Sequence, residues 1–379
     1  MDAGISLYPD FMDEAALDRY VRTAAALGFR HVFLSLILEE LHFAGAAGPG
    51  SPVFDRAMAR CHAAGMTVTA DINPQVMEGF GSPEAAVADL KRRGVDILRA
   101  DSALDQAVLT ALAGAGMGIE LNAADLDAST PEGRSRADGE IRRLLASLPA
   151  GMVRACFNFY PRTGSGLSLD RVRQSTAFLH TYGIHTAAFV ASMTAAPVLH
   201  AHGRGVCTAE CLRDVPPEAA AAVLRCCGVD EVLLGDLSAS PAELSALAAC
   251  CREEVFSLPV VFCRDCPEEL RAQLTRVKLS NREDAPAYIL RATATRGVSV
   301  PPFRTGPRPR FSVTADNSRS AQYQGEIQIM LRDMPPCEEA SAIGFVHPDA
   351  HVLLPFLTDH RLAFRLAPYP GVQAADGPA

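Results

Sequence analysis

The sequence predicts a (β/α)8 barrel, the TIM-barrel form of α/β protein, followed by a small β-rich domain. The first two-thirds of the 379 residues repeats one unit eight times, a short apolar run followed by an amphipathic helical run. The short runs are apolar throughout, which is typical of parallel strands covered by helices. Eight units are the number that closes a barrel, and a doubly wound open sheet is the alternative topology. No Gly-x-Gly-x-x-Gly motif follows the first strand, so dinucleotide binding is not expected.

The eight units can be placed from the apolar periodicity and from the glycines that end helices. Strands are expected at 4–8, 31–36, 67–72, 97–100, 118–123, 152–159, 185–191 and 231–236. Helices are expected at 13–27, 51–64, 83–93, 103–115, 131–148, 168–182, 216–227 and 241–254. Gly28, Gly65, Gly94 and Gly228 stand directly after four of these helices, as C-terminal stops do.

The pattern changes after residue 254. One more helix is expected at 267–276, and short strands separated by turns rich in Pro, Gly, Asn and Asp are expected at 287–295, 310–315, 326–331, 342–345, 351–356 and 362–366. We therefore expect a barrel domain over residues 1–256 and a β-rich domain over residues 257–379, a size that can hold its own core.

Composition narrows the classes of partner. The chain has 35 basic and 44 acidic residues, a formal net charge of -9, and no basic cluster, so neither nucleic acid nor a membrane is an expected partner. No signal peptide and no apolar stretch of membrane-spanning length is visible, which favours a cytoplasmic protein. The eleven cysteines include one Cys-x-x-Cys pair, Cys263 and Cys266, without a second pair, so we expect no metal and no other cofactor. The oligomeric state stays open, a homodimer included.

Candidate site residues stand where the predicted strands end, because barrel enzymes carry their reactive groups at the carboxyl ends of strands. Those at strand ends are Tyr8, Ser35, Asp71, Asn73, Arg99, Asp101, Glu120, Asn122, Asn158, Tyr160, Arg162 and Asp236. Two of the carboxylates can hydrolyse a glycoside, one as acid and one as base or nucleophile. Carboxylates can also hold a divalent metal, but the strand ends lack the histidines that zinc prefers. For Arg99, an ion pair with Asp71 or Asp101 is the alternative to substrate binding.

The stretch from Cys156 to Ser168 combines a strand end with a glycine loop. The strand is followed by Asn158, Tyr160 and Arg162, and then by Gly164 and Gly166 before the next helix. Free N–H groups in such a loop, beside a guanidinium, favour a site for an anion or a sugar. A strand-to-helix turn with solvated polar residues is the other interpretation.

Taken together, the motifs resemble those of the MupG-like TIM-barrel family. They run in the expected order: Gly4-Ile5-Ser6-Leu7-Tyr8, Phe33-Leu34-Ser35-Leu36 with Glu39-Glu40, Ala70-Asp71-Ile72-Asn73-Pro74, Leu98-Arg99-Ala100-Asp101, Leu121-Asn122-Ala123, Asn158-Phe159-Tyr160-Pro161-Arg162 with Gly166-Leu167-Ser168, Gly235-Asp236, Asn281-Arg282 and Gly325-Glu326-Ile327-Gln328-Ile329. The Asn-Phe-Tyr-Pro-Arg run is the most specific of them. The family architecture is an N-terminal barrel followed by a cyclophilin-like β domain.

The resemblance implies a 6-phospho-N-acetylmuramidase, which cleaves MurNAc 6-phosphate–GlcNAc inside the cell during peptidoglycan recycling. For such a hydrolysis we expect Asp71 and Glu120 as the carboxylate pair, with Asp236 in reserve. Substrate contacts are expected from Tyr8, Ser35, Asn73, Arg99, Asp101, Asn122, Asn158, Tyr160, Arg162, Gly166, Glu210 and, from the second domain, Arg282.

Some family positions differ in this chain. Ile37 and Leu38 stand where a His and a Pro usually precede the acidic pair, and Phe157 stands where a His usually precedes the Asn-Phe-Tyr-Pro run. Another phosphosugar or glycoside therefore stays open as the substrate. A phosphosugar lyase or epimerase that uses the same barrel mouth, and a non-catalytic sugar-phosphate-binding protein, are the alternative functions.

Overall fold

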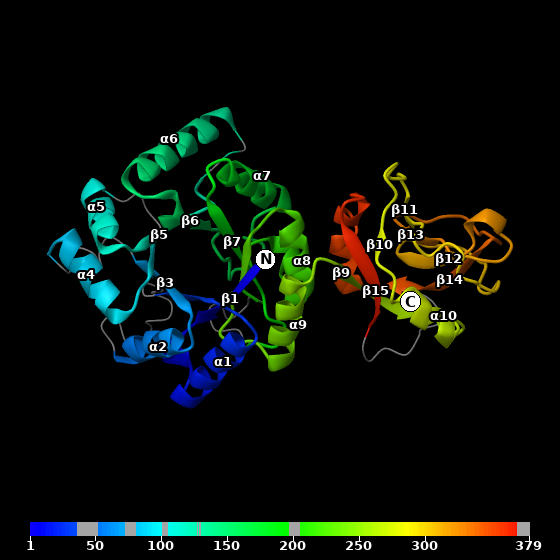
Figure 1. Cartoon of the computed structure of the whole chain (residues 1–379), viewed down its shortest axis with the longest axis horizontal. Helices are drawn as coiled ribbons and strands as arrows, with labels where there is room; N and C mark the ends of the chain where they lie inside the picture. The colour runs from blue at the N-terminus through cyan, green and yellow to red at the C-terminus, as the bar shows by residue number, and fades with distance from the viewer. Residues whose placement is uncertain are drawn as a thin grey trace. The chain divides into compact units, whose positions relative to one another are not determined.

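The computed structural model describes residues 1–35, 52–72, 81–100, 105–126, 128, 130–196 and 205–369. The chain divides into two compact units, Met1–Cys251 and Arg252–Ala379, each of which is described by itself (Figure 1).

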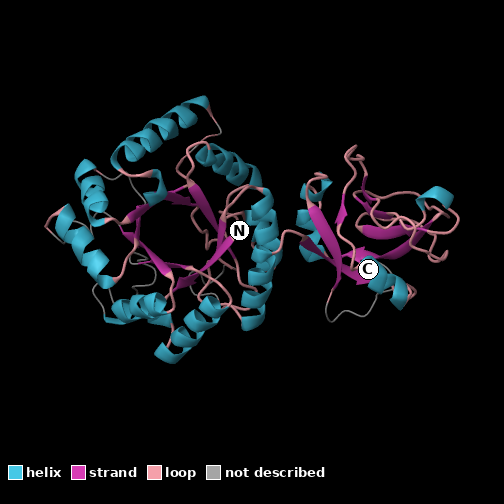
Figure 2. Cartoon of the chain, in the orientation of Figure 1, coloured by secondary structure: helices cyan, strands magenta, loops and turns pink. Residues whose placement is uncertain are grey.

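The first unit is a closed barrel of parallel strands inside a ring of helices (Figure 2). The strands follow one another around the barrel in sequence order, and the last pairs with the first. They are β1 Asp2–Leu7, β2 His31–Ser35, β3 Thr67–Ile72, β4 Ile97–Ala100, β5 Gly118–Asn122, β6 Val153–Cys156, β7 His185–Val190 and β8 Glu231–Leu234. The predicted (β/α)8 barrel is confirmed.

The outer helices begin and end within three residues of the predicted bounds. They are α1 Glu14–Ala26, α2 Pro52–Ala63, α4 Pro83–Arg93, α5 Gln106–Ala115, α6 Pro131–Ser147, α7 Leu169–His180, α8 Pro217–Cys226 and α9 Pro241–Arg252. Side-chain oxygens cap several N-termini; Ser168, for example, accepts a hydrogen bond from the backbone N–H of Arg171 at the start of α7. Gly94 ends α4 in the left-handed conformation with φ of 106°, which glycine adopts without strain.

The barrel interior is not apolar throughout, which corrects one expectation. Alternate residues of the strands face the barrel interior, and at its N-terminal end these include His31, Thr69, Arg154 and Glu231. His31, Thr69 and Glu231 are buried. The rings of Phe33, Phe159 and Phe189 pack edge to face, with centroids 5.2 to 5.9 Å apart.

The second unit is a mixed seven-stranded sheet in the order β10-β15-β9-β14-β12-β13-β11. The strands are β9 Phe256–Phe262, β10 Leu279–Ser280, β11 Ile289–Ala292, β12 Ser312–Asp316, β13 Ile327–Met330, β14 Ala340–Val346 and β15 Ala363–Pro368, with α10 at Glu268–Leu274. The edge strands approach one another, because the N–H of Arg282 donates to the carbonyl of Arg291 at 3.0 Å. The sheet is therefore a nearly closed barrel, and the expected β-rich fold is confirmed.

Two details of the second unit differ from expectation. The predicted strand at 351–356 is wrong, because Pro348–Leu353 forms a short 3-10 helix that Pro348 starts. β9 and the two-residue β10 were not expected. β9 pairs with β14 and β15, and β10 pairs with β15, so both belong to the second sheet.

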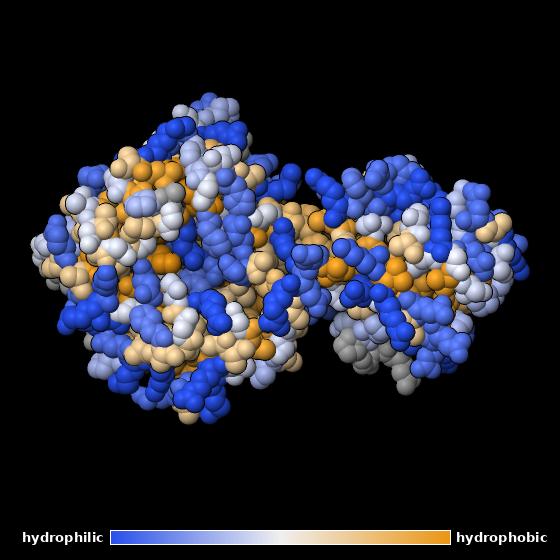
Figure 3. All heavy atoms as spheres, viewed as in Figure 1, coloured by the Kyte–Doolittle hydropathy of each residue, from blue (hydrophilic) through white to orange (hydrophobic). Residues whose placement is uncertain are grey.

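Hydrophilic residues, with apolar ones between them, cover the faces visible in Figure 3. None of the helices that the structure describes has both the length and the apolar character needed to cross a bilayer.

Asp316, at the end of β12, is a buried carboxylate in the second unit. Its residue is 5% exposed, and burial, with the negative charge of Glu326 as a second cause, raises the pKa of Asp316 to about 6. A raised carboxyl pKa means that the folded state holds the proton more tightly than the unfolded chain does.

Asp316 is therefore expected to make the second unit less stable as pH rises from about 4 to about 6, the interval between its unfolded and folded pKa values. Asp316→Asn should remove that loss and be more stable than wild type at pH 7 by about 2–3 kcal/mol, at about 1.4 kcal/mol per pKa unit. Denaturant titrations followed by circular dichroism at pH 4 and pH 7 measure the difference. Equal gains at both pH values would contradict the assignment.

Candidate active site

Asp71 and Ser35 lie side by side at the carboxyl ends of β3 and β2. The strand register places Ser35 opposite Asp71, and Asp71 opposite Arg99 of β4. Ser35 Oγ donates a hydrogen bond of 2.8 Å to Asp71 Oδ2. Both side chains are buried, with Asp71 4% exposed. This hydrogen bond holds the Asp71 carboxylate in one orientation at the barrel mouth.

Asp236 follows β8 and is a buried carboxylate of a different kind. Its Oδ2 accepts backbone hydrogen bonds from Ser192 at 2.8 Å and Val206 at 3.1 Å, while Oδ1 makes no hydrogen bond to the described part of the chain. Burial raises the pKa of Asp236, and the two N–H donors only partly oppose that rise. A carboxyl with a raised pKa is suited to donate a proton near neutral pH.

Tyr8 lies within electrostatic reach of both carboxylates. Its hydroxyl donates to the carbonyl of Gly235 at 2.5 Å. Burial raises the pKa of Tyr8 far above its usual value, and the charges of Asp236 and, more weakly, Asp71 add to the rise. Tyr8 therefore stays neutral, and Asp71 and Asp236 belong to one neighbourhood.

Glu120 lies between two arginines in the barrel interior and is fully buried. Arg99 Nη1 donates to Glu120 Oε1 at 3.2 Å. Arg154 Nε lies 2.9 Å from Glu120 Oε2 without hydrogen-bond alignment, so that contact is ionic. The alternative interpretation of Arg99 as an ion-pair residue is supported, and Glu120 is a partner that the sequence did not indicate.

The ion pairs continue toward the N-terminal end of the barrel. Arg154 also pairs with Glu231, whose other oxygen lies 3.0 Å from His31 Nδ1. His31 Nε2 in turn lies 2.6 Å from Thr69 Oγ1. Burial alone would raise the pKa of Glu231, but the charges of His31 and Arg154 hold it well below its usual value. Arg154, Glu231 and His31 were not among the residues predicted for the site. Their inward position has a signal in the sequence, because side chains at even spacing along a strand, such as His31, Phe33 and Ser35, lie on one face.

Arg99 also determines how Asn158 is presented. Arg99 Nη1 donates to the carbonyl of Cys156 at 3.2 Å, and Nη2 donates to Asn158 Oδ1. With Oδ1 engaged, the Nδ2 group of Asn158 is the donor left for a ligand, and it has no partner in the described chain. Thr208 Oγ1 fixes the backbone by donating to the Asn158 carbonyl at 2.9 Å.

Tyr160 is half-buried at the same mouth. Burial raises the pKa of its hydroxyl, and the charge of Asp125 adds to the rise while Arg171 and Arg99 oppose it. Asn122 is nearby in sequence to Asp125 and donates to it at 2.9 Å. Asp125 and Arg171 are thus mouth residues that the sequence analysis did not name.

The N–H groups of the glycine loop are not free, which corrects the expectation for Gly166. Glu210 accepts hydrogen bonds of 2.7 Å from the N–H groups of both Gly164 and Gly166. Arg213 donates to both oxygens of Glu210, at 2.8 and 2.6 Å. A Cβ at Gly166 would lie 2.7 Å from Glu210 Oε2, so only glycine allows this approach. Glu210 therefore acts as a clamp between two loops.

Arg162 projects from the clamped loop and is exposed. Its carbonyl accepts hydrogen bonds from Ser165 and from Arg213 at 3.2 Å, so its backbone position is fixed. Its guanidinium forms no ion pair with the described residues. A fixed backbone with an unpaired guanidinium is suited to bind an oxyanion.

Three candidate residues are not placed at this mouth. Asn73 and Asp101 lie outside the described residues. Arg282 belongs to the second unit, where it pairs with Asp284 at 3.0 Å. Within the described ranges, no three His, Cys, Asp or Glu side chains gather as metal ligands would.

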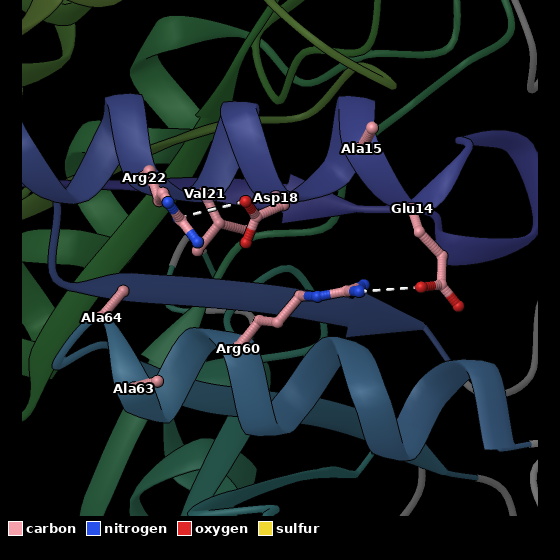
Figure 4. Close-up of a pocket in the computed structure, with 8 residues that line it drawn as sticks. All are labelled: Glu14, Ala15, Asp18, Val21, Arg22, Arg60, Ala63 and Ala64. Atoms are coloured by element: carbon pink, nitrogen blue, oxygen red, sulfur yellow. Dashed lines mark hydrogen bonds and ion pairs between the residues drawn. The ribbon is translucent and has the colours of Figure 1, made fainter.

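A separate groove lies outside the barrel, between α1 and α2 (Figure 4). Its charged side chains pair with one another: Arg60 with Glu14 at 2.9 Å, and Arg22 with Asp18 at 3.1 Å. Such exposed pairs are ordinary surface contacts, and the strand-end groups described above are not part of the groove.

Fold and site together define a barrel protein whose ionisable groups gather at the carboxyl ends of parallel strands, as in barrel enzymes. Residues 3–249 match the family model described as 6-phospho-N-acetylmuramidase, N-terminal, and residues 256–367 match the corresponding C-terminal model. The chain belongs to the 6-phospho-N-acetylmuramidase (MupG) family.

Solved structures show the same two-part fold. An uncharacterized B. cereus protein is 24% identical, with a TM-score of 0.81 over 97% of this chain and 99% of that one. A conserved Enterococcus faecalis protein with an unknown function is also 24% identical, with a TM-score of 0.71 over 98% and 97%. No curated protein sequence matches the chain.

Replacing Glu120 with Gln should destabilise the barrel by about 3–5 kcal/mol, because the buried guanidinium groups of Arg99 and Arg154 would then face a neutral amide in place of the carboxylate between them. Thermal unfolding followed by circular dichroism measures the loss. Glu14→Gln is the matched control, because it removes an exposed carboxylate that also pairs with two arginines, Arg56 and Arg60. A Glu120→Gln protein as stable as the Glu14→Gln protein would show that the buried pairs do not support the fold.

Proposed function

We propose that this protein is a glycoside hydrolase that cleaves a phosphorylated amino-sugar disaccharide of the MurNAc 6-phosphate–GlcNAc type, within the cell and in peptidoglycan recycling. Membership in the 6-phospho-N-acetylmuramidase family supports the reaction class and the substrate class. The observation that carries the proposal is the pair of buried carboxylates, Asp71 and Asp236, that both act on Tyr8 at the barrel mouth.

Asp236 is the better proton donor of the two. Burial raises its pKa, and Oδ1 is the oxygen left to meet the glycosidic oxygen. Asp71 accepts a hydrogen bond from Ser35 and serves as base or nucleophile. We assign Asp236 rather than Glu120 as the partner of Asp71, because Glu120 is fully buried and flanked by Arg99 and Arg154.

The remaining mouth residues suit the binding of a phosphorylated sugar. Asn158, oriented by Arg99, and the hydroxyl of Tyr160 would contact sugar hydroxyls or the acetamido group. Arg162 would bind the phosphate through its unpaired guanidinium, while Glu210 holds the loop that carries it. In this assignment Glu210 and Gly166 support the site and do not contact substrate.

Asp71→Asn and Asp236→Asn should each lower turnover by roughly 10²–10⁴-fold, since each removes one proton-transfer group and changes little in shape. Products from the phosphorylated disaccharide are followed by mass spectrometry, with Asp18→Asn as a surface-carboxylate control. Wild-type turnover in both site variants would remove these residues from the mechanism. Binding without any product in the wild type would favour the sugar-phosphate-binding alternative.

The pH profile separates the two roles. An acid with a raised pKa works only while protonated, so wild-type turnover should fall as pH rises through the pKa of Asp236. Asp236→Asn should lose this alkaline limb in its residual activity, whereas Asp71→Asn should keep it. The reverse result would exchange the assignments.

Arg162→Gln should raise KM for the phosphorylated disaccharide by roughly tenfold or more, because a charge-assisted contact is lost. The KM of the same disaccharide without its phosphate should hardly change. Arg171→Gln, another mouth arginine, is the comparison variant. Equal increases in KM for both substrates would show that Arg162 does not bind the phosphate.

A further inference from the structure

The second unit carries a polar sheet face that the proposed hydrolysis does not use. Across β11, β13 and β12, Arg291, Gln328 and Thr314 stand opposite one another in register and therefore share one face. The residues next to them, such as Ile329 and Val313, face the other way and are fully buried. The Gly325-to-Ile329 motif thus delivers Glu326 and Gln328 to the polar face.

The arginines of this face differ in their partners. Arg291 and Arg296 both pair with Glu326, which is fully buried, and both stack on Tyr323. Arg308 pairs only with neutral oxygens in the described chain: Nη1 donates to Gln328 Oε1 at 3.3 Å, and Nε donates to the carbonyl of Pro335 at 3.1 Å. Arg308 therefore forms no direct ion pair with a carboxylate among the described residues, although its charge acts on Asp316 and works to lower the pKa of that carboxyl against the rise that burial causes.

Two neighbours of Arg308 also have unused hydrogen-bonding capacity. Asp316 is 5% exposed, yet its oxygens receive only the Gln328 amide, at 3.2 and 3.4 Å. Thr314 is fully buried, and its Oγ1 has no hydrogen-bond partner among the residues that the structure describes. A buried hydroxyl without a partner is costly unless a ligand or water completes it.

The backbone around these groups is fixed. Arg308 and Met334 exchange backbone hydrogen bonds of 3.2 and 2.8 Å, which hold the segment before β12 against the segment after β13. One fixed backbone frame therefore holds the four polar side chains of Arg308, Gln328, Thr314 and Asp316. Gln328 joins Arg308 to Asp316 through hydrogen bonds to both.

We propose that Arg308, Gln328, Thr314 and Asp316 form a binding site for a small oxyanion, a carboxylate or a phosphate, that carries a neighbouring hydroxyl. The anionic oxygens contact Arg308, and the hydroxyl donates to Asp316 while Thr314 Oγ1 completes the shell. The ligand takes over contacts that Gln328 now makes to both charged side chains. This site is independent of the proposed hydrolase activity.

Isothermal titration of the full chain with lactate, a hydroxylated carboxylate, and with inorganic phosphate tests the proposal. Arg162→Gln is the background for every titration, so that the barrel arginine does not contribute. We expect at least one of the two anions to bind at one saturable site per chain. The anion that binds shows whether the natural ligand is a hydroxylated carboxylate or a phosphate. Arg308→Gln should weaken binding by roughly tenfold to a hundredfold.

Arg310→Gln is the matched control, because Arg310 is an exposed arginine two residues away that packs on Phe311 and is not part of the array. Thr314→Val is a second test: it keeps the side-chain shape and should leave the protein at least as stable as wild type, because it removes a buried hydroxyl that has no partner among the described residues, but it should weaken binding of the anion. No saturable binding of either anion, or equal losses in Arg308→Gln and Arg310→Gln, would overturn the proposal.

Discussion

The carboxylate of Glu120, held between Arg99 and Arg154, is the interaction on which the barrel mouth depends. Three charges in a buried interior are tolerable only because each has an opposite charge within contact distance. Arg99 can therefore donate a hydrogen bond to Asn158 at the barrel mouth while Glu120 balances its positive charge. The orientation of a mouth residue is thus set by an ion pair that no ligand touches.

A second constraint joins the two loops that follow β6 and β7. Glu210 and Arg213 form a pair that binds the backbone of the neighbouring loop, Glu210 at Gly164 and Gly166, and Arg213 at the carbonyls of Tyr160 and Arg162. These hydrogen bonds to the backbone make the loop a fixed part of the barrel rather than a free turn. Glycine is required there because Glu210 approaches within the space of a side chain.

In both units, the partners of an arginine indicate whether it stabilises the fold or is available to bind a ligand. Arg154, Arg213 and Arg291 are paired with carboxylates and hold elements together. Arg162 and Arg308 form no direct ion pair with a carboxylate in the described chain, although the backbone of each is fixed by hydrogen bonds. Charges that the fold does not neutralise are where an anionic ligand gains most.

The sequence by itself determined the barrel, the β-rich second unit, the family, and the strand-end position of Asp71 and Asp236, because periodicity and the β/α repeat are local properties. It also indicated a polar strand end at Asn158 and Tyr160. It could not indicate which charges pair, since Arg99 with Glu120 and Glu210 with Gly166 are contacts between segments far apart in the chain. Tertiary structure alone decided that the glycine loop's N–H groups are occupied and that Glu120 is enclosed by arginines. Whether two charges pair depends on their distance in the folded structure, and that distance cannot be inferred from their separation along the chain.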